Sequence, residues 1–376
     1  MAAGALDEIF RAQKPADGVL RELYACHRNA GARDRAQISG LVYGVLRNYF
    51  PLRAALGERA TATELCEEHA GGAAARGALD DAARHNLPAW LWHKLQVQFG
   101  GQAAALADAL NEPATVDLRV NTLKATREAA QQALRDDGIE STPTPHSPSG
   151  LRLARREALQ RTRAFRDGWV EPQDEGSQLL ARFVEPKAGE IVVDFCAGAG
   201  GKALALGALM RNRGELHALD SSRTRLQRFE PRLQRSGLSI VRVRALRNEH
   251  DASLGALVQR CDAVLVDAPC SATGTLRRNP ELRLRTPDLA ALAAQQLGIL
   301  GAAAKLVKPG GRLVYATCSV LAEENREVVA RFLESRADFR CDAELVLLPH
   351  RDGTDGFYAA RLTAPSSGSR PRPSGT

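Results

Sequence analysis

The chain has 376 residues, enough for two or three domains that each bury a core of their own. Its 51 lysines and arginines exceed its 44 aspartates and glutamates, and the net charge of +7 favours a polyanionic partner, nucleic acid first. Seven singly scattered cysteines and the lack of an apolar run of about 18 residues exclude a disulfide scaffold, a clustered zinc site and a membrane span, so we expect a cytoplasmic protein with reduced thiols.

The first predicted region is helical. Apolar residues recur there at helical spacing, as at Ile38, Leu41, Val42, Val45 and Leu46. We expect a helical N-terminal domain over residues 1–112.

A compact region of mixed pattern follows. It reads as a strand at 116–120, a helix at 126–136 that stops at Gly138, and a second strand at 150–154. This pattern predicts a small αβ subdomain over residues 113–170.

The longest region alternates strands with helices, which predicts an α/β fold with a doubly wound, mostly parallel sheet. Its strands are expected at 191–195, 215–219, 240–244, 263–267, 312–317, 344–348 and 357–362. The clearest helix covers 287–307 and stops at a Lys-Pro-Gly-Gly sequence. We assign 171–363 to this domain and expect the Ser/Pro/Gly-rich tail, 364–376, to be disordered.

A glycine-rich turn joins the first of these strands to a helix. It consists of Cys196, Ala197, Gly198, Ala199, Gly200, Gly201 and Lys202. A nucleoside triphosphate loop would need glycine at 196 and serine or threonine at 203, where the chain has Cys196 and Ala203. Asp220 ends the next strand about 20 residues on, where a carboxylate can bind both ribose hydroxyls of NAD or of S-adenosylmethionine.

Two cysteines distinguish between these cofactors. Cys270 follows Asp267-Ala-Pro and Cys318 follows Tyr315-Ala-Thr, and each comes after an apolar strand, at the end where open sheets bind ligands. Hydride transfer has no use for paired thiols. Methylation of cytosine C5 does, because a thiolate must add to C6, a carboxyl group such as Asp267 must stabilise charge near N3, and a second thiol can help release the product. The alternative is that both cysteines are packing residues, as we expect for Cys26, Cys66, Cys261 and Cys341.

With these motifs the chain resembles the family of bacterial rRNA small-subunit methyltransferase B and eukaryotic Nop2/Sun RNA cytosine-5 methyltransferases. The shared motifs are Arg119-Val-Asn121-Thr122, Gln173-Asp174-Glu-Gly-Ser177-Gln178, the glycine turn, Leu219-Asp220, Asp267-Ala-Pro-Cys270, Arg277-Arg278-Asn-Pro280, Lys308-Pro-Gly-Gly311, Tyr315-Ala-Thr-Cys318-Ser319, Glu323-Glu324-Asn325 and Asp355-Gly356-Phe357.

The resemblance implies a class I methyltransferase fold and roles for individual residues. Cys318 corresponds to the nucleophile and Cys270 to the thiol that assists product release, although DNA cytosine methyltransferases use a Pro-Cys cysteine as nucleophile, which makes Cys270 the competitor. Residues 196–202, Asp220 and Asp267 correspond to S-adenosylmethionine contacts. Arg119 and Asn121 correspond to the RNA-facing element of the family. Independently of the resemblance, Arg277 and Arg278 belong to a basic segment after Cys270, with Arg283 and Arg285, that we expect to bind RNA phosphates; a solvated basic loop is the alternative. The N-terminal helices resemble a shortened NusB-like RNA-binding domain.

The chain departs from the family at two places. Gly198-Ala199 replaces the usual Ala-Pro of the glycine turn, and the segment 244–251 leaves open whether Asn248 or Asp251 binds the adenine. We expect a monomeric enzyme that makes 5-methylcytosine in small-subunit rRNA and binds neither membrane nor metal. A tRNA methyltransferase of the same family, a catalytically silent ribosome-assembly factor and an amino-group methyltransferase are the alternatives.

Overall fold

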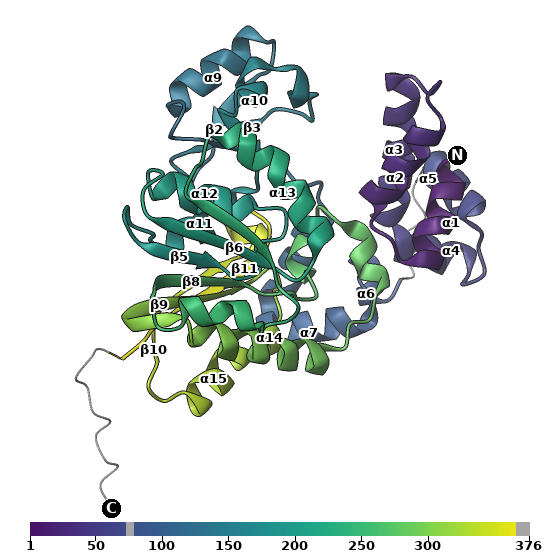
Figure 1. The fold of residues 1–376 in the computed structure, drawn as a ribbon. Helices are drawn as coiled ribbons and strands as arrows, with labels where there is room; N and C mark the ends of the chain where they lie inside the picture. Colours follow the sequence, from purple (N-terminus) through teal and green to yellow (C-terminus); the bar gives the residue numbers. More distant parts are fainter. Residues whose placement is uncertain (73–78, 366–376) are drawn as a thin grey trace, which may run out of the picture. The chain divides into compact units, whose positions relative to one another are not determined.

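The computed structural model describes residues 1–72 and 79–365, which divide into two compact units (Figure 1). The helical unit comprises Met1–Ala114, Ala272–Pro287 and Leu348–Gly353, and the sheet unit comprises Thr115–Ser271, Asp288–Leu347 and the chain from Thr354. Most of the tail that we expected to be disordered lies outside the described residues. Within residues 1–72 and 79–365, every helix is too short or too polar to cross a membrane.

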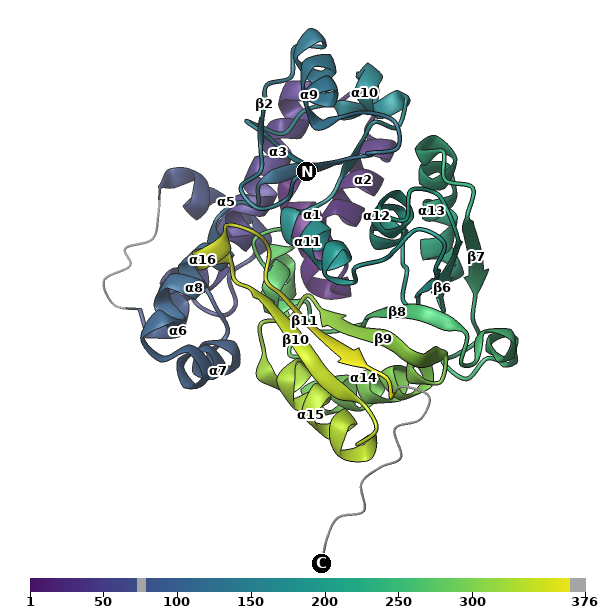
Figure 2. The ribbon, with the colours of Figure 1, turned by 90° about the vertical axis from the view of Figure 1, so that its left-hand side faces the viewer.

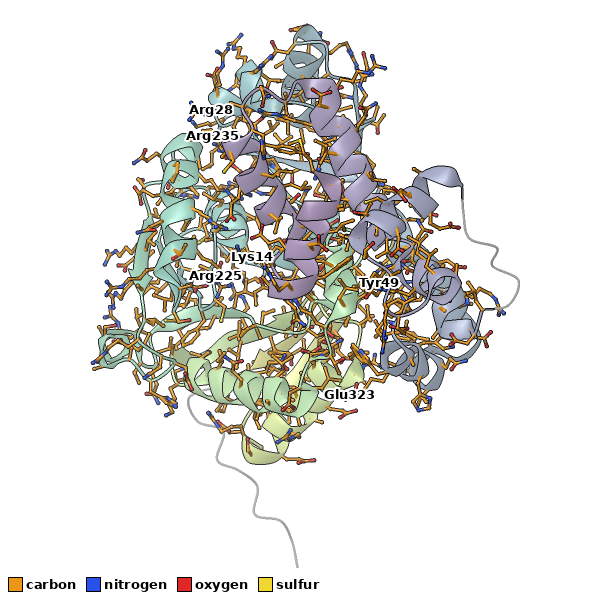
Figure 3. The ribbon with its side chains drawn as sticks, turned by 90° about the vertical axis from the view of Figure 1, so that its right-hand side faces the viewer. Lys14, Arg28, Tyr49, Arg225, Arg235 and Glu323 are labelled. Carbon is orange, nitrogen blue, oxygen red and sulfur yellow. The ribbon has the colours of Figure 1, made fainter. Side chains whose placement is uncertain are left out.

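The helical unit packs short amphipathic helices around a core of leucine, isoleucine and valine. Its helices are α1 (Ala2–Ala12), α2 (Ala16–Cys26), α3 (Ala32–Leu46), α4 (Tyr49–Leu56), α5 (Ala62–Gly71), α6 (Asp81–Arg84), α7 (Ala89–Phe99), α8 (Ala103–Asn111) and α16 (Pro349–Asp352). Leu6, Ile9 and Leu46 are fully buried in the core of α1–α5. At its edge the ring of Tyr49, labelled in Figure 3, packs 5.4 Å from that of Phe10.

Two segments from later in the chain complete this unit. Ala272–Pro287 contains the 3-10 turns η5 (Thr273–Thr275) and η6 (Pro280–Leu284). Arg283 of η6 is 1% exposed and donates hydrogen bonds to the backbone oxygen of Asn86 and to the side chain of Asn111. No local sequence pattern indicated this placement, because the partners of Arg283 lie more than 170 residues away in the chain.

The sheet unit begins with a small antiparallel sheet in the order β2-β3-β1-β4. Its elements are β1 (Val116–Val120), α9 (Arg127–Asp136), β2 (Ser141–Pro143), β3 (Gly150–Leu153), α10 (Arg163–Arg166) and β4 (Val170–Pro172). Leu118 and Leu151 of the strands pack with Leu134 of α9 in a separate core. Thr126 caps α9 by accepting a hydrogen bond from the Ala129 amide.

The main sheet has seven strands in the order β10-β11-β9-β8-β5-β6-β7. Its elements are α11 (Glu175–Phe183), β5 (Ile191–Asp194), α12 (Gly201–Leu209), β6 (Glu215–Asp220), α13 (Arg223–Ser236), β7 (Val241–Ala245), the 3-10 helix η4 (Ala252–Leu257), β8 (Cys261–Asp267), α14 (Leu289–Ala304), β9 (Val307–Thr317), the 3-10 turn η7 (Ala322–Glu324), α15 (Arg326–Ser335), β10 (Arg340–Leu347) and β11 (Phe357–Thr363). Strands β5–β9 pair in parallel, and β11 pairs antiparallel with β9 and β10. This confirms the predicted doubly wound, mostly parallel sheet.

Helices cover both faces of the main sheet because its central strands are apolar on both sides (Figure 2). Along β8, Val264 and Val266 pack with α14 and α15, whereas Ala263 and Leu265 face the core formed by α11, α12 and α13. Some element boundaries differ from the prediction: α14 ends at Ala304 rather than at 307, β9 begins at Val307 rather than at 312, and β10 begins at Arg340 rather than at 344. The Pro-Gly-Gly sequence is an irregularity inside β9, where the register with β8 shifts and Gly310 has a φ of 71°.

Candidate active site

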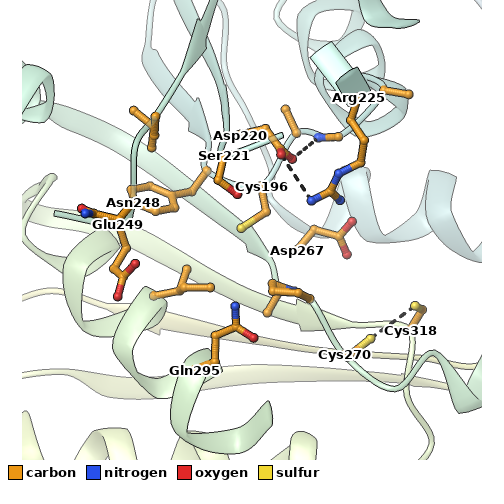
Figure 4. Close-up of a pocket in the computed structure, with 18 residues that line it drawn as sticks. Cys196, Asp220, Ser221, Arg225, Asn248, Glu249, Asp267, Cys270, Gln295 and Cys318 are labelled. Atoms are coloured by element: carbon orange, nitrogen blue, oxygen red, sulfur yellow. Dashed lines mark hydrogen bonds and ion pairs between the residues drawn. The ribbon is translucent and has the colours of Figure 1, made fainter. Parts of the chain in front are cut away.

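The candidate site lies at the carboxyl ends of β5, β6, β8 and β9. The strand order reverses at β5, which pairs with β6 on one side and β8 on the other, and such a switch point is where open α/β sheets bind ligands. A cavity of about 400 Å³ opens there, within the size range of ligand pockets (Figure 4). Its walls are formed by Phe195–Ala199, Asp220, Ser221, Arg225, Leu246, Asn248, Glu249, Asp267–Cys270, Gln295, Ile299 and Cys318.

The glycine turn forms one wall, and two of its glycines have the positive φ angles that favour this residue. Gly200 has a φ of 81°, and a Cβ atom there would lie 2.0 Å from the ring of Phe229 in α13. Gly198 has a φ of 56°, and its amide donates a hydrogen bond to Asp220. Glycine at 200 therefore allows close packing against α13, and the turn at Gly198 places its amide against Asp220.

Asp220 is held rigidly at the cavity wall. Its carboxylate accepts hydrogen bonds from the amides of Gly198 at 2.8 Å and Ser222 at 2.7 Å, and Nη2 of Arg225 lies 3.3 Å away (Figure 4). Arg225 projects from α13, as does Arg235 (Figure 3). The anchoring places a fixed carboxylate beside the glycine turn, as the sequence predicts for a ribose-binding residue.

Asp267 lines the cavity, and two charged side chains outside the cavity wall, Lys202 and Asp194, interact with it. Lys202 Nζ is 2.6 Å from Asp267 Oδ2, and the pKa of Lys202 is raised because this charge outweighs the opposing effect of burial. Asp194 is fully buried, and neither of its oxygens makes a hydrogen bond of standard geometry among the described residues. Burial, followed by the charge of Asp267, raises the pKa of Asp194 to about 7. A cationic ligand would relieve this excess of buried negative charge.

The two predicted thiols lie together at the rim. Cys270 Sγ and Cys318 Sγ are 3.4 Å apart, and both residues are half-buried, so a reactant can reach them (Figure 4). Cys196 lies deeper in the cavity wall, where burial and then Asp194 raise its pKa well above the usual value. The structure therefore brings Cys270, Cys318 and Asp267 to one cavity, and the raised pKa of Cys196 disfavours its thiolate form.

Two of the cysteines that we expected to pack in cores do not. Cys66 and Cys261 are buried, but Cys26 and Cys341 are exposed. Cys26 is the last residue of α2, and Cys341 lies on β10, an edge strand of the main sheet. Core burial was the wrong expectation there because both positions lie where an element meets solvent.

The structure places the two candidates for binding the adenine, Asn248 and Asp251, in different environments. Asn248 lines the cavity, whereas Asp251 accepts hydrogen bonds from the amides of Arg247 and Ser253, which lower its pKa. Glu249 and Gln295 also line the cavity, although we did not predict them. Glu249 directly follows Asn248 and could have been found there, but Gln295 projects from α14, and no motif marks it.

Of the residues predicted to bind RNA, Arg119, Asn121 and Arg277 are buried. Arg119 is 5% exposed and its Nε donates to Gln173, while Asn121 donates to the backbone oxygens of Gly168 and Ser236. In the helical unit, Arg277 donates to the backbone oxygen of Gly353 and is 6% exposed. Arg278 is half-buried. An RNA-binding role for these four residues stays a prediction.

Comparison with known proteins gives two family matches. A model described as 16S rRNA methyltransferase RsmB/F matches residues 181–363, and one described as an RsmF/B-like, ferredoxin-like domain matches residues 87–160. Ribosomal RNA small subunit methyltransferase B of Vibrio cholerae serotype O1 is 35% identical over 345 residues, covering 89% of this chain and 74% of that protein. Its namesake from Serratia proteamaculans is 33% identical over 371 residues, covering 95% and 80%.

Solved structures of similar fold include the protein PH0851, with a TM-score of 0.81 and 26% identity over 96% of each chain. A methyltransferase homolog protein from Pyrococcus horikoshii aligns with a TM-score of 0.66 and 28% identity, covering 76% of this chain and 98% of its own. NSun6 from the same organism, solved with SFG, has a TM-score of 0.67 and 23% identity, covering 74% and 99%. This last likeness shows the fold alone.

Proposed function

This chain belongs to the 16S rRNA methyltransferase RsmB/F family, and we propose that it transfers a methyl group from S-adenosylmethionine to carbon 5 of a cytosine in small-subunit rRNA. The observation that carries the cytosine-5 assignment is the pair of thiols, 3.4 Å apart, at the rim of a cavity that also contains Asp267. Methylation of an amino group or of a hydroxyl needs no such pair.

S-adenosylmethionine fits the residues of the cavity. The ligand carries a positive sulfonium and an ammonium group, and the buried Asp194 carboxyl, without a hydrogen-bond partner among the described residues, favours such charge. We assign the ribose to Asp220, the remainder of the nucleoside to the wall formed by Phe195, Leu246 and Asn248, and the amino-acid end to the glycine turn. When bound, the cofactor supplies an electrophilic methyl group.

Cys318 acts first in the proposed mechanism. Its thiolate adds to C6 of the cytosine, so an S–C6 bond forms and the electrons of the C5–C6 double bond become available at C5. Negative charge develops around N3 during this addition, and Asp267, held by Lys202, stabilises it by sharing a proton with N3. The ammonium group of Lys202 is also within electrostatic reach of Cys318.

Cys270 acts in product release. After C5 accepts the methyl group, its proton passes to solvent, the electrons of the C5–H bond re-form the C5–C6 double bond, and the S–C6 bond breaks with its electrons returning to the Cys318 thiolate. Cys270, 3.4 Å from the nucleophile, is placed to assist this elimination. The target base must be unstacked, because a thiol can approach C6 only from the face of the ring.

Bisulfite sequencing of total rRNA and tRNA, from cells with and without the gene, tests the proposal. Because 5-methylcytosine resists conversion by bisulfite, we expect one cytosine of small-subunit rRNA to become convertible when the gene is absent. If a tRNA cytosine becomes convertible instead, the cytosine-5 reaction stands and the substrate is tRNA. No change in either RNA pool would contradict the proposal and favour the silent assembly factor.

A further inference from the structure

A buried glutamate connects the two loops that carry the thiols. Glu324 lies in η7, between β9 and α15, and is 0% exposed. Its Oε1 accepts a hydrogen bond from the amide of Ser271, the residue after Cys270, at 2.8 Å. Its Oε2 accepts hydrogen bonds from the hydroxyl of Ser271 at 2.5 Å and from the hydroxyl of Ser319, the residue after Cys318, at 2.6 Å.

The surroundings of Glu324 fix its position from several sides. Gln296 of α14, also 0% exposed, donates from Nε2 to Glu324 Oε1 at 3.1 Å and to the backbone oxygen of Pro269 at 3.0 Å. The hydroxyl of Tyr315 in β9 donates to the backbone oxygen of Glu324 at 2.6 Å. The carboxylate is thus held independently of the two serines that it binds.

The charge of Glu324 is costly to bury, and its hydrogen bonds offset that cost. A buried carboxylate loses several kcal/mol of hydration unless its lone pairs are satisfied. Here the satisfying donors come from both cysteine loops, which follow the neighbouring strands β8 and β9. Strand pairing ends before the cysteines, so it fixes the two strands and leaves the loops to be fixed by other contacts.

We propose that Glu324 is a positioning residue that holds the Cys270 loop against the Cys318 loop and so keeps the two sulfur atoms within reach of each other. Glu324 is not among the residues that line the cavity, and it acts through Ser271 and Ser319. The positioning role stands on this geometry, whereas its effect on turnover rests on the proposed function. With the loops separated, Cys318 can still attack a base, but Cys270 lies too far away to assist release.

Thiol–disulfide exchange of the full chain with glutathione tests the positioning without RNA. Two protein thiols and one glutathione disulfide give one Cys270–Cys318 disulfide and two glutathione thiols, so the equilibrium measures the effective concentration of one thiol at the other. Differential alkylation and mass spectrometry of the two cysteine peptides separate this pair from the other five cysteines. We expect Glu324→Gln to lower the effective concentration by about tenfold or more, the size expected for losing hydrogen bonds to a charged group.

The matched control is Glu327→Gln, which changes an exposed carboxylate in α15 and should leave the equilibrium as in the wild type. If Glu324→Gln does not fold, the double variant Ser271→Ala with Ser319→Ala removes both hydroxyl donors and keeps the contacts of Glu324 with Gln296 and with the Ser271 amide. Equal exchange equilibria in a folded variant and the wild type would overturn the proposal. So would a wild-type protein that forms no Cys270–Cys318 disulfide.

A second measurement separates this inference from the proposed function. On RNA substrate, Glu324→Gln should accumulate a covalent protein–RNA adduct, as Cys270→Ala should, and Glu324→Asp should restore part of the turnover. A merely destabilised protein would lose activity without an adduct. A changed exchange equilibrium with no adduct in any variant would retain the positioning role and contradict the two-thiol mechanism.

Discussion

Both units of the molecule bury charged side chains, and they use them differently. In the helical unit, Glu281 accepts a hydrogen bond from the Ala16 amide and Arg283 donates to the backbone oxygen of Asn86, so these charges fasten distant segments of one core. In the sheet unit, Asp267 lines a cavity that also carries two thiols, and its charge acts on Lys202, with which it pairs, and on the buried Asp194.

A shifted pKa alone does not distinguish the buried charges of the helical unit from those of the sheet unit. Burial lowers the pKa of Arg283 to about 9 and raises that of Asp194 to about 7, and both side chains have atoms without hydrogen-bond partners among the described residues. The difference is that Asp267, which interacts with both Lys202 and Asp194, borders space that a ligand can fill and lines the same cavity as two thiols. A shifted pKa therefore marks a functional site only together with a cavity and a reactive neighbour.

The strongest test of the sheet unit is Cys318→Ala. We expect no measurable methyl transfer, because no other group in the site replaces the nucleophile, while the affinity for S-adenosylmethionine stays close to that of the wild type. A radiolabel transfer assay and calorimetry measure the two quantities. Full activity in this variant would assign the nucleophile to Cys270 or end the covalent mechanism.

Cys270→Ala should block a later step. The Cys318–C6 bond is expected to form and then persist, so an RNA adduct that survives denaturing electrophoresis should accumulate. Cys341→Ala, which removes an exposed cysteine on β10, is the control and should turn over normally. A Cys270→Ala enzyme that releases product at the wild-type rate would remove this residue from the mechanism.

Arg283→Met tests the structural role of buried charge in the helical unit. Loss of its hydrogen bonds leaves the Asn86 and Asn111 oxygens without this donor, and we expect the free energy of unfolding to fall by about 1–3 kcal/mol. Chemical denaturation measures this change, and Arg28→Met, at an exposed position of the same unit, is the control (Figure 3). Weaker cofactor binding without lost stability would contradict the contrast between the units.

The smallest expected effect concerns the protons of Asp194. Its pKa of about 7 lies above the value of 3.8 for an unperturbed aspartate, so between these pH values the folded protein binds a proton that the unfolded chain does not bind. The stability that this proton contributes to the folded state is lost as pH rises through 7. A cationic ligand favours the ionised form, so binding of S-adenosylmethionine at pH 7 should release up to about half a proton. Calorimetry in two buffers of different ionisation enthalpy measures the release, which Asp194→Asn should abolish.

Sequence reasoning succeeded where the signal was local. The strand predicted at 191–195 is β5 (Ile191–Asp194). Cys270 and Cys318 both follow the end of a strand, because the apolar run before each cysteine forms β8 or β9. Sequence reasoning failed where the contacting residues lie far apart in the sequence. Arg277 looked like part of an exposed basic segment, yet it is buried, and its contact with Gly353 joins residues 76 positions apart. Glu324 was visible only as part of a motif, since its hydrogen bond to Ser271 joins residues 53 positions apart.

The helical unit is built from three separate segments of the chain, and this has a consequence for folding during synthesis. Its helices α1–α8 leave the ribosome before η6, which supplies Arg283 and Glu281 and follows them by about 170 residues, and α16 comes later still. Contacts of such separation close slowly, because a long loop must be ordered before they form. These helices are synthesised before the sheet unit and should nevertheless be among the last elements to reach their final stability. A nascent chain that ends before residue 272 should hold α1–α8 in an incomplete, protease-sensitive state.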